Sequence, residues 1–313
     1  MLADTVNAVR RALAVAFLSV LLLLSGCGHG EKTAAPPPTT EPVAEPTQPT
    51  SPPEPLPPPP SARAMSWSSA GAFVWNEANI SPEALGEELA GAGFGWVVLR
   101  VHDGLVEDPV DGDWVRRFRR VSGLPVGGWG VLRDHPRLEA ALADALVARH
   151  GLDFYVANAE AEYAYSGPDG ASDQRFGRSH AFVDTFRRLQ PGLPAGLSSY
   201  CRPVDHDLDW GTWRNAGFGF LPQAYVNDFG SAAAPTACAA AARPFFGTAV
   251  HPTIGTYPGS RSTLPPERYA RLLARAGTVG FSVYLAETEM TVDEWRVLGE
   301  SIGPDGIALA PGS

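Results

Sequence analysis

The chain has 313 residues, a formal net charge of −10 and 44% hydrophobic residues. This acidic balance argues against nucleic-acid binding, because the phosphate backbone is bound through clustered Lys and Arg. We therefore expect no nucleic-acid partner, and we interpret the charge only as typical of a soluble protein.

Residues 1–26 have the features of an export signal. Arg10 and Arg11 precede an apolar stretch that ends at Leu24 and is shorter than a membrane span requires. The run Leu24-Ser25-Gly26-Cys27 resembles the lipobox of bacterial lipoproteins. This resemblance implies cleavage before Cys27, lipidation of its thiol and anchoring to the outer face of the bacterial cell membrane. The alternative is an ordinary signal peptide followed by a chance cysteine.

Residues 27–64 are predicted to be a disordered linker, because prolines stand there among Thr, Glu, Ser and Ala. Proline favours the extended polyproline II conformation, which would hold the rest of the chain away from a membrane. Residues 65–313 remain, and about 250 residues suit a single α/β barrel domain.

Apolar runs alternate with amphipathic stretches through this domain. The predicted strands are 72–75, 96–101, 125–131, 153–158, 195–200, 218–225, 249–255 and 279–285. Such alternation implies parallel strands, and eight units fit a (β/α)8 TIM-type barrel. A doubly wound sheet is the alternative, but FVWNEANIS follows the first strand in place of a Gly-rich phosphate loop. We therefore expect no cofactor.

Helical patterns separate the strands. Ser81 before Pro82 predicts a helix N-cap. Apolar residues at helical spacing predict buried stripes, which are Leu138, Leu142, Leu146 and Val147; Phe182, Phe186 and Leu189; Tyr269, Leu272 and Leu273; and Trp295, Leu298 and Ile302.

The carboxyl ends of the strands should carry the site, as they do in such barrels. The polar and aromatic residues found there are, in strand order, Trp75 and Asn76; His102 and Asp103; Trp129 and Arg133; Asn158, Glu160, Glu162 and Tyr163; Tyr200 and Arg202; Gln223, Tyr225, Asn227 and Asp228; His251 and Tyr257; and Tyr284, Glu287 and Glu289.

The fourth predicted strand is the most informative. Asn158, Glu160 and Glu162 recur at every second residue, so their side chains should share one face. Two neighbouring carboxyl groups suit glycoside cleavage, which needs a proton donor and a second group that stabilises the oxocarbenium ion. Aromatic side chains near most strand ends match the apolar faces of sugar rings. A single aromatic is more often core packing, so the argument depends on their recurrence.

The run Asn158-Ala-Glu160-Ala-Glu162-Tyr163 resembles the DxDxE strand of glycoside hydrolase family 18, and Gln223-Ala-Tyr225 resembles that family's sixth-strand motif. Family 25 lysozymes are also similar, because they carry a DxE motif on the fourth strand and a QxY motif on the sixth. The first alignment implies that Glu162 is the general acid and Glu160 its neighbour, whereas the second gives Glu160 the acid role. Asn158 stands where an Asp is expected in either family.

These arguments predict Glu160 and Glu162 as catalytic residues. The predicted substrate-binding residues are Asn158, Trp75, Asp103, Trp129, Tyr163, Gln223, Tyr225, Tyr257 and Glu287. The predicted function is hydrolysis of a polysaccharide, either a cell-envelope or an N-acetylhexosamine glycan, by a monomer. The alternatives are a barrel that binds glycans without cleaving them and a metal-dependent hydrolase that uses His102, Asp103, Glu160 and His251. The last lacks HxH and HExxH motifs, so no metal is expected.

Cys201 and Cys238 follow or lie between predicted strands of adjacent units. In an exported protein an even pair suggests a disulfide, and the alternative is two buried thiols.

Overall fold

The computed structural model describes residues 65–160, 172–203, 208–247, 250–257, 280–284 and 298, with side chains left out for 172–176. They belong to one compact unit, Leu56–Ser313. The predictions for Cys27, Glu162, Tyr163, Glu287, the signal peptide and the linker boundary at 64 lie outside the described residues. So do those for Tyr269, Leu272, Leu273, Glu289, Trp295 and Ile302.

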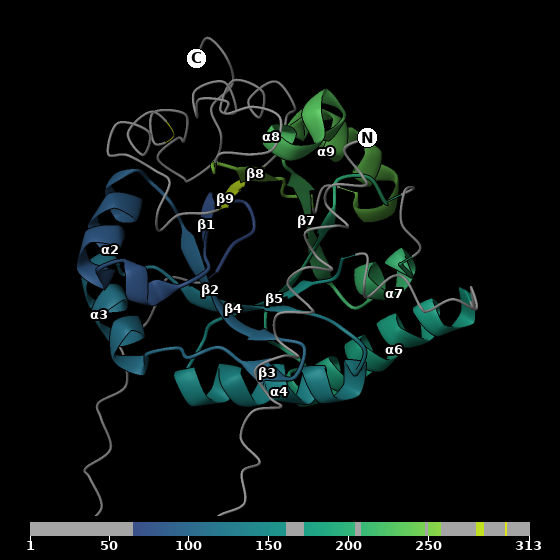
Figure 1. Ribbon diagram of the computed structural model, residues 1–313, viewed down its shortest axis with the longest axis horizontal. Helices are drawn as coiled ribbons and strands as arrows, with labels where there is room; N and C mark the ends of the chain where they lie inside the picture. Colours follow the sequence, from purple (N-terminus) through teal and green to yellow (C-terminus); the bar gives the residue numbers. More distant parts are fainter. Residues whose placement is uncertain are drawn as a thin grey trace, which may run out of the picture. The chain divides into compact units, whose positions relative to one another are not determined.

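Eight parallel strands close into a barrel (Figure 1). They are β1 (Gly71–Val74), β2 (Trp96–Asp103), β4 (Val126–Val131), β5 (Tyr155–Asn158), β6 (Ala195–Tyr200), β7 (Phe218–Ala224), β8 (Thr253–Gly255) and β9 (Ser282–Tyr284). The first strand pairs with both β2 and β9, so the sheet has no open side. This closure confirms the predicted (β/α)8 barrel and excludes the doubly wound sheet, which would end in edge strands.

The predicted strands agree with the observed ones to within a few residues. The largest difference is β8, which begins at Thr253 instead of residue 249, with an isolated bridge between Phe220 and Val250 before it. One strand was not expected. The two-residue β3 (Val106–Glu107) pairs antiparallel with the end of β2 and extends the sheet beyond the barrel.

Helices cover the barrel between the strands. The longer ones in the described part are α2 (Pro82–Gly91), α3 (Gly112–Ser122), α4 (Pro136–His150), α6 (Ser172–Leu189) and α9 (Pro235–Phe246); α7 (Trp210–Asn215), α8 (Val226–Phe229) and the 3-10 turns Glu77–Asn79 and Gly230–Ala233 are short. The Ser81 hydroxyl accepts the Ala84 N–H at 3.4 Å, which confirms the predicted cap. No helix in this part of the chain is both long and apolar enough to span a bilayer.

Two of the described residues of the predicted apolar stripes are exposed to solvent. Leu138 in the first turn of α4 is 59% exposed, and Leu189 at the end of α6 is 41% exposed. In α4 the neighbouring Glu139 takes the buried position instead. Its Oε1 accepts the backbone N–H groups of Arg133 and His135 at 2.9 and 3.2 Å, so it caps the helix start from inside. Glu139 thus supplies the acceptor for backbone N–H groups at the start of α4, and Leu138 is left exposed.

Large aromatic side chains fill the barrel at the amino ends of its strands. Trp67, from the segment before β1, contacts Trp96 and Phe154 edge to face, with ring centroids 5.7 and 5.8 Å apart. Glycines make room for them. A Cβ on Gly196 would lie 2.8 Å from the Trp67 ring, and a Cβ on Gly127 would overlap with Phe154. This packing fills the barrel at the amino ends of the strands.

Candidate functional site

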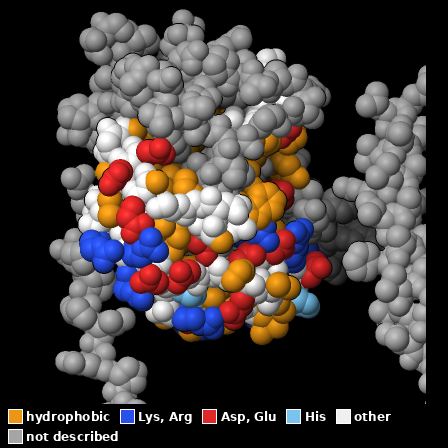
Figure 2. Space-filling view, turned by 60° about the vertical axis from the view of Figure 1, so that its left-hand side comes forward, with side chains coloured by type: hydrophobic (Ala, Val, Ile, Leu, Met, Phe, Trp, Pro, Cys, Tyr) orange, Lys and Arg blue, Asp and Glu red, His pale blue; other side chains and the backbone are white. Residues whose placement is uncertain are grey.

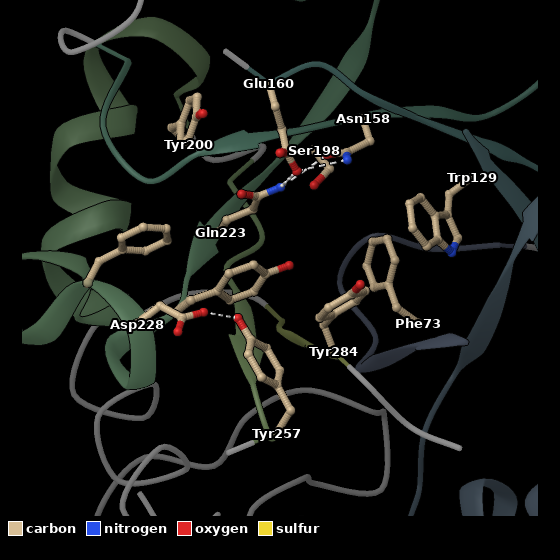
Figure 3. A pocket seen from close by; sticks show the side chains of 12 residues that line it. Phe73, Trp129, Asn158, Glu160, Ser198, Tyr200, Gln223, Asp228, Tyr257 and Tyr284 are labelled. Carbon is tan, nitrogen blue, oxygen red and sulfur yellow. Dashed lines mark hydrogen bonds between the residues drawn. The ribbon is translucent and has the colours of Figure 1, made fainter. Parts of the chain in front are cut away.

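A cavity of about 350 Å³ opens at the carboxyl ends of the strands (Figure 3). Twelve described residues line it, and they come from β1, β4, β5, β6, β7, β9 and the segments after β5, β7 and β8. They are Phe73, Trp129, Asn158, Glu160, Ser198, Tyr200, Gln223, Tyr225, Asp228, Phe229, Tyr257 and Tyr284. This is the end of the barrel at which enzymes of this fold bind their substrates.

The alternation of β5 determines which of its side chains reach the cavity. Tyr155 points outward and packs against Phe186 of α6, with ring centroids 5.3 Å apart. Asn158 and Glu160 have the opposite parity and line the cavity, as the sequence predicts. The third residue of the series, Glu162, lies outside the described residues.

Glu160 is held by two side-chain amides. Its Oε1 accepts one N–H from Asn158 Nδ2 at 3.0 Å and another from Gln223 Nε2 at 2.8 Å. Gln223 Nε2 also donates to Asn158 Oδ1 at 3.1 Å, so the three side chains form a closed set. With Oε1 occupied in this way, Oε2 is the oxygen left to meet a ligand, since no donor to it is found among the described residues.

Three tyrosines form another wall of the cavity. Tyr225 and Tyr284 stack with ring centroids 5.6 Å apart, and Tyr257 stands edge-on to both at 5.8 Å. The Tyr257 hydroxyl donates to Asp228 Oδ2 in a short hydrogen bond. Burial raises the pKa of Tyr225 well above its ordinary value, and the neighbouring tyrosines and carboxylates add to this. Burial and Asp228 likewise raise the pKa of Tyr257, so both hydroxyls keep their protons at neutral pH.

Phe73 and Trp129 form an apolar wall that leads to Tyr284 (Figure 3). Their rings meet edge to face with centroids 6.0 Å apart, and Phe73 also contacts Tyr284 at 6.2 Å. The Trp129 Nε1–H donates to the Val74 carbonyl oxygen at 3.0 Å, which fixes the indole. Rigid aromatic faces of this kind suit the apolar faces of a sugar ring.

Two residues predicted to bind substrate do not line this cavity. Trp75 follows the end of β1, is 48% exposed and has the Arg100 guanidinium 5.0 Å from its ring centroid. Asp103 accepts from Arg133 Nε at 2.7 Å, and this contact lowers the pKa of Asp103. An irregularity between Arg100 and His102 breaks the alternation of β2, which the sequence pattern does not reveal.

Three lining residues were missed by the sequence analysis, namely Phe73, Ser198 and Phe229. Ser198 had a signal, because it lies two residues before Tyr200 on the same strand and therefore points the same way. Phe229 had none, since it lies on the short α8 outside the barrel strands. Tyr200, Asp228 and Tyr284 had been noted only as strand-end residues.

The four residues of the metal-hydrolase alternative are dispersed. His102 lies outside the barrel wall, where its Nε2 and the Tyr155 hydroxyl are 2.7 Å apart. His251 lies at the closed end beside Trp67, with ring centroids 6.2 Å apart. Nowhere in the described part do three His, Cys, Asp or Glu side chains gather as metal ligands. The geometry thus gives these residues no common site.

A disulfide ties two segments beside the cavity. Cys201, directly after Tyr200 of β6, is bonded to Cys238 of α9. The bond therefore links the segment after β6 to the helix between β7 and β8, and it supports the position of Tyr200 in the wall.

Solved structures similar to this one include several chitinases. A class V chitinase from Nicotiana tobaccum matches with a TM-score of 0.56 and 9% identity over 76% of this chain and 99% of that chain. A class V chitinase from Pseudomonas fluorescens Pf-5 matches with a TM-score of 0.53 and 11% identity over 75% of this chain and 98% of that chain. A family 18 chitinase from Cycas revoluta, solved with (GlcNAc)3, matches with a TM-score of 0.54 and 8% identity over 74% of this chain and 99% of that chain.

The sequence itself matches no protein-family model and no curated protein. At these low identities the likeness concerns the backbone alone. The chain thus has the barrel fold of the family 18 chitinases.

Proposed function

We propose that the protein is a glycoside hydrolase that acts on a polysaccharide, with cell-envelope and N-acetylhexosamine polymers as the first candidates. The observation that supports this best is Glu160, a carboxyl side chain held by two amides inside a cavity walled by aromatic rings. The proposal is also supported by the chitinase-like fold and by the position of the cavity at the carboxyl ends of the strands, where barrel enzymes bind their substrates.

The proposed reaction breaks the bond between the anomeric carbon and the glycosidic oxygen. A carboxylic acid gives its proton to that oxygen, which leaves as the alcohol of one sugar. A second group stabilises the positive charge on the anomeric carbon, and water then supplies OH to this carbon and returns a proton to the acid. Glu160 and Glu162 are our candidates for the carboxylic acid, while Asn158 and Gln223 position Glu160.

The test is release of reducing ends from cell-wall and N-acetylhexosamine polysaccharides. The full-length protein, Glu160→Gln and Glu162→Gln would be compared with Glu107→Gln, a carboxylate paired with Arg149 on the outer surface. We expect the unaltered protein and Glu107→Gln to release reducing ends. One of the two site variants should lose this activity. The variant that loses release but still binds the polysaccharides identifies the acid.

A second candidate is a barrel that binds glycans without cleaving them. It is favoured by Asn158, which replaces a carboxylate that both resembling families carry. In that case the same polysaccharides bind but release no reducing ends. Neither binding nor release on the whole panel would contradict both candidates.

We also propose that the protein is exported and anchored through lipidated Cys27, and that it acts as a monomer. The lipobox-like run and the Pro-rich segment after it support the anchor. Cys27→Ser should move the protein from the membrane fraction to the soluble one in a bacterial host. An unchanged distribution would contradict the anchor without affecting the proposed activity.

A further inference from the structure

The cavity differs in charge from the outer surface of the barrel. On the side that carries α2 and α3, acidic and basic side chains are interspersed (Figure 2). Arg117 contacts Glu83 at 2.7 Å there, and Arg116 contacts Asp113 at 3.0 Å. The cavity instead brings the carboxyl groups of Glu160 and Asp228 among aromatic, amide and hydroxyl side chains. The described lining thus contains two carboxyl groups and no Lys or Arg side chain.

The donors to Glu160 that lie in the described part of the chain carry no charge. Asn158 and Gln223 donate amide N–H groups, which orient the carboxyl group without supplying a positive charge. An ion pair with Arg or Lys would have oriented the carboxyl group and also neutralised its charge. The contacts of Glu160 thus leave it able to attract a cation through Oε2.

The carboxyl groups of Glu160 and Asp228 also act on the tyrosine wall. After burial and the neighbouring tyrosines, the charges of Glu160 and Asp228 contribute to the raised pKa of Tyr225. A negative potential that opposes the loss of a hydroxyl proton also favours a cation at that place. The faces of Tyr225, Tyr284 and Trp129 add the attraction of aromatic rings for ammonium groups.

From these contacts we propose that the substrate is a polymer of amino sugars with free amines, whose ammonium group is bound by Glu160 beside the tyrosine wall. The inference rests on the proposed function and names its substrate class. An acetamido group is neutral and gains nothing from the charge of a carboxylate. A free amine forms a charge-assisted hydrogen bond with Oε2, which is roughly twice as strong as a neutral one.

This choice of substrate has a chemical consequence. A sugar without an acetyl group cannot use an acetamido oxygen to stabilise its own anomeric carbon, so the protein must supply the stabilising group. Asp228 lies on another side of the cavity from Glu160 (Figure 3) and is oriented by the Tyr257 hydroxyl. In this proposal Glu160 binds the amine as a carboxylate and so is not the proton donor, and Asp228 is the candidate for the group at the reacting carbon.

The test compares binding of three tetramers to the full-length protein by calorimetry. They are a tetramer of glucosamine, the same tetramer fully N-acetylated, and a tetramer of glucose. We expect the glucosamine tetramer to bind at least about tenfold more tightly than the other two near pH 6, with affinity falling as salt is added. Glu160→Gln should abolish the difference, and Asp113→Asn, which removes one charge from the outer surface, should leave it unchanged.

The possible results separate the inference from the proposed function. Equal or tighter binding of the N-acetylated tetramer would overturn the inference and leave the hydrolase standing. A preference for glucosamine that survives in Glu160→Gln would overturn the role of this residue. If none of the tetramers binds and no polysaccharide is cleaved, the proposed function fails together with the inference.

Discussion

Gln223 reaches across one strand to hold Glu160. Its Nε2 lies 2.8 Å from Glu160 Oε1, although β6 separates β7 from the strand that leads to Glu160. Both side chains point into the barrel mouth, where the strands converge on one cavity. The position of Glu160 is therefore a property of the closed barrel and cannot arise in an isolated strand pair.

Removing this contact should impair the site more than the fold. A hydrogen bond to a charged group contributes about 1.5–3 kcal/mol, so Gln223→Leu should lower kcat/KM or glycan affinity roughly 10- to 100-fold. Gln190→Leu is the matched control, because Gln190 Nε2 donates to Asp144 Oδ1 at 2.6 Å between α6 and α4. If both variants lose activity equally, the effect of Gln223 is one of folding.

Asn158→Asp should destabilise the protein at neutral pH. The donor 3.0 Å from Glu160 Oε1 would become a second carboxylate, and two like charges at this distance repel unless they share a proton. We expect a loss of about 1–3 kcal/mol in unfolding free energy at pH 7 and a smaller loss at pH 5. Asn215→Asp, the same change beside Arg214 on the surface, is the control. Equal losses at both pH values would contradict the explanation.

The disulfide between Cys201 and Cys238 should contribute measurably to stability. It closes a loop of 37 residues, for which chain entropy alone gives about 4 kcal/mol. In a domain of this size that corresponds to a fall in Tm of roughly 10 °C for the Cys201→Ser, Cys238→Ser double variant. Reduction of the wild-type protein should give the same Tm by scanning calorimetry. No change on reduction would mean that the bond does not form in solution.

Acid should destabilise the closed end of the barrel through His251. Burial lowers the pKa of this imidazole to about 4, against about 6.5 in an unfolded chain. The contribution of His251 is therefore fully present above pH 6.5 and is lost as pH falls toward 4. It amounts to about 3 kcal/mol, to be measured by urea unfolding at pH 7 and 4.5.

His251→Phe should reduce this dependence by about that amount, because no imidazole remains to be protonated there. His102, whose pKa burial also lowers to about 4, should supply a similar dependence that survives in the variant. A pH dependence that is unaltered in His251→Phe would contradict the assignment.

The glycines inside the barrel should resist substitution. Gly127→Ala would force a methyl group into the Phe154 ring, and such overpacking costs typically 1–3 kcal/mol. Gly177→Ala in α6 has open space around it and should be stabilising by about 0.5–1 kcal/mol. Equal unfolding free energies for the two variants would show that Phe154 has room to move.

The sequence predicted the barrel well, because each strand is a buried apolar run between helix signals that the local sequence carries itself. The inward direction of Asn158 and Glu160 followed from the period of two in the same way. These features depend on a few neighbouring residues, so one sequence suffices to find them.

The walls of the cavity were harder to predict, because they depend on where strands end and bend. Asp103 follows the irregularity in β2, and Arg133 binds it away from the cavity. Phe229 reaches the cavity from α8, whose placement is set by the barrel as a whole. Contacts of this kind join distant parts of the chain and leave no local pattern.

Trp67 also determines how the protein can be handled. The chain enters the barrel at the end that this indole closes, and the cavity opens at the opposite end. A tag or a surface fused directly at Met65 is therefore attached to the domain at the end of the barrel opposite the cavity.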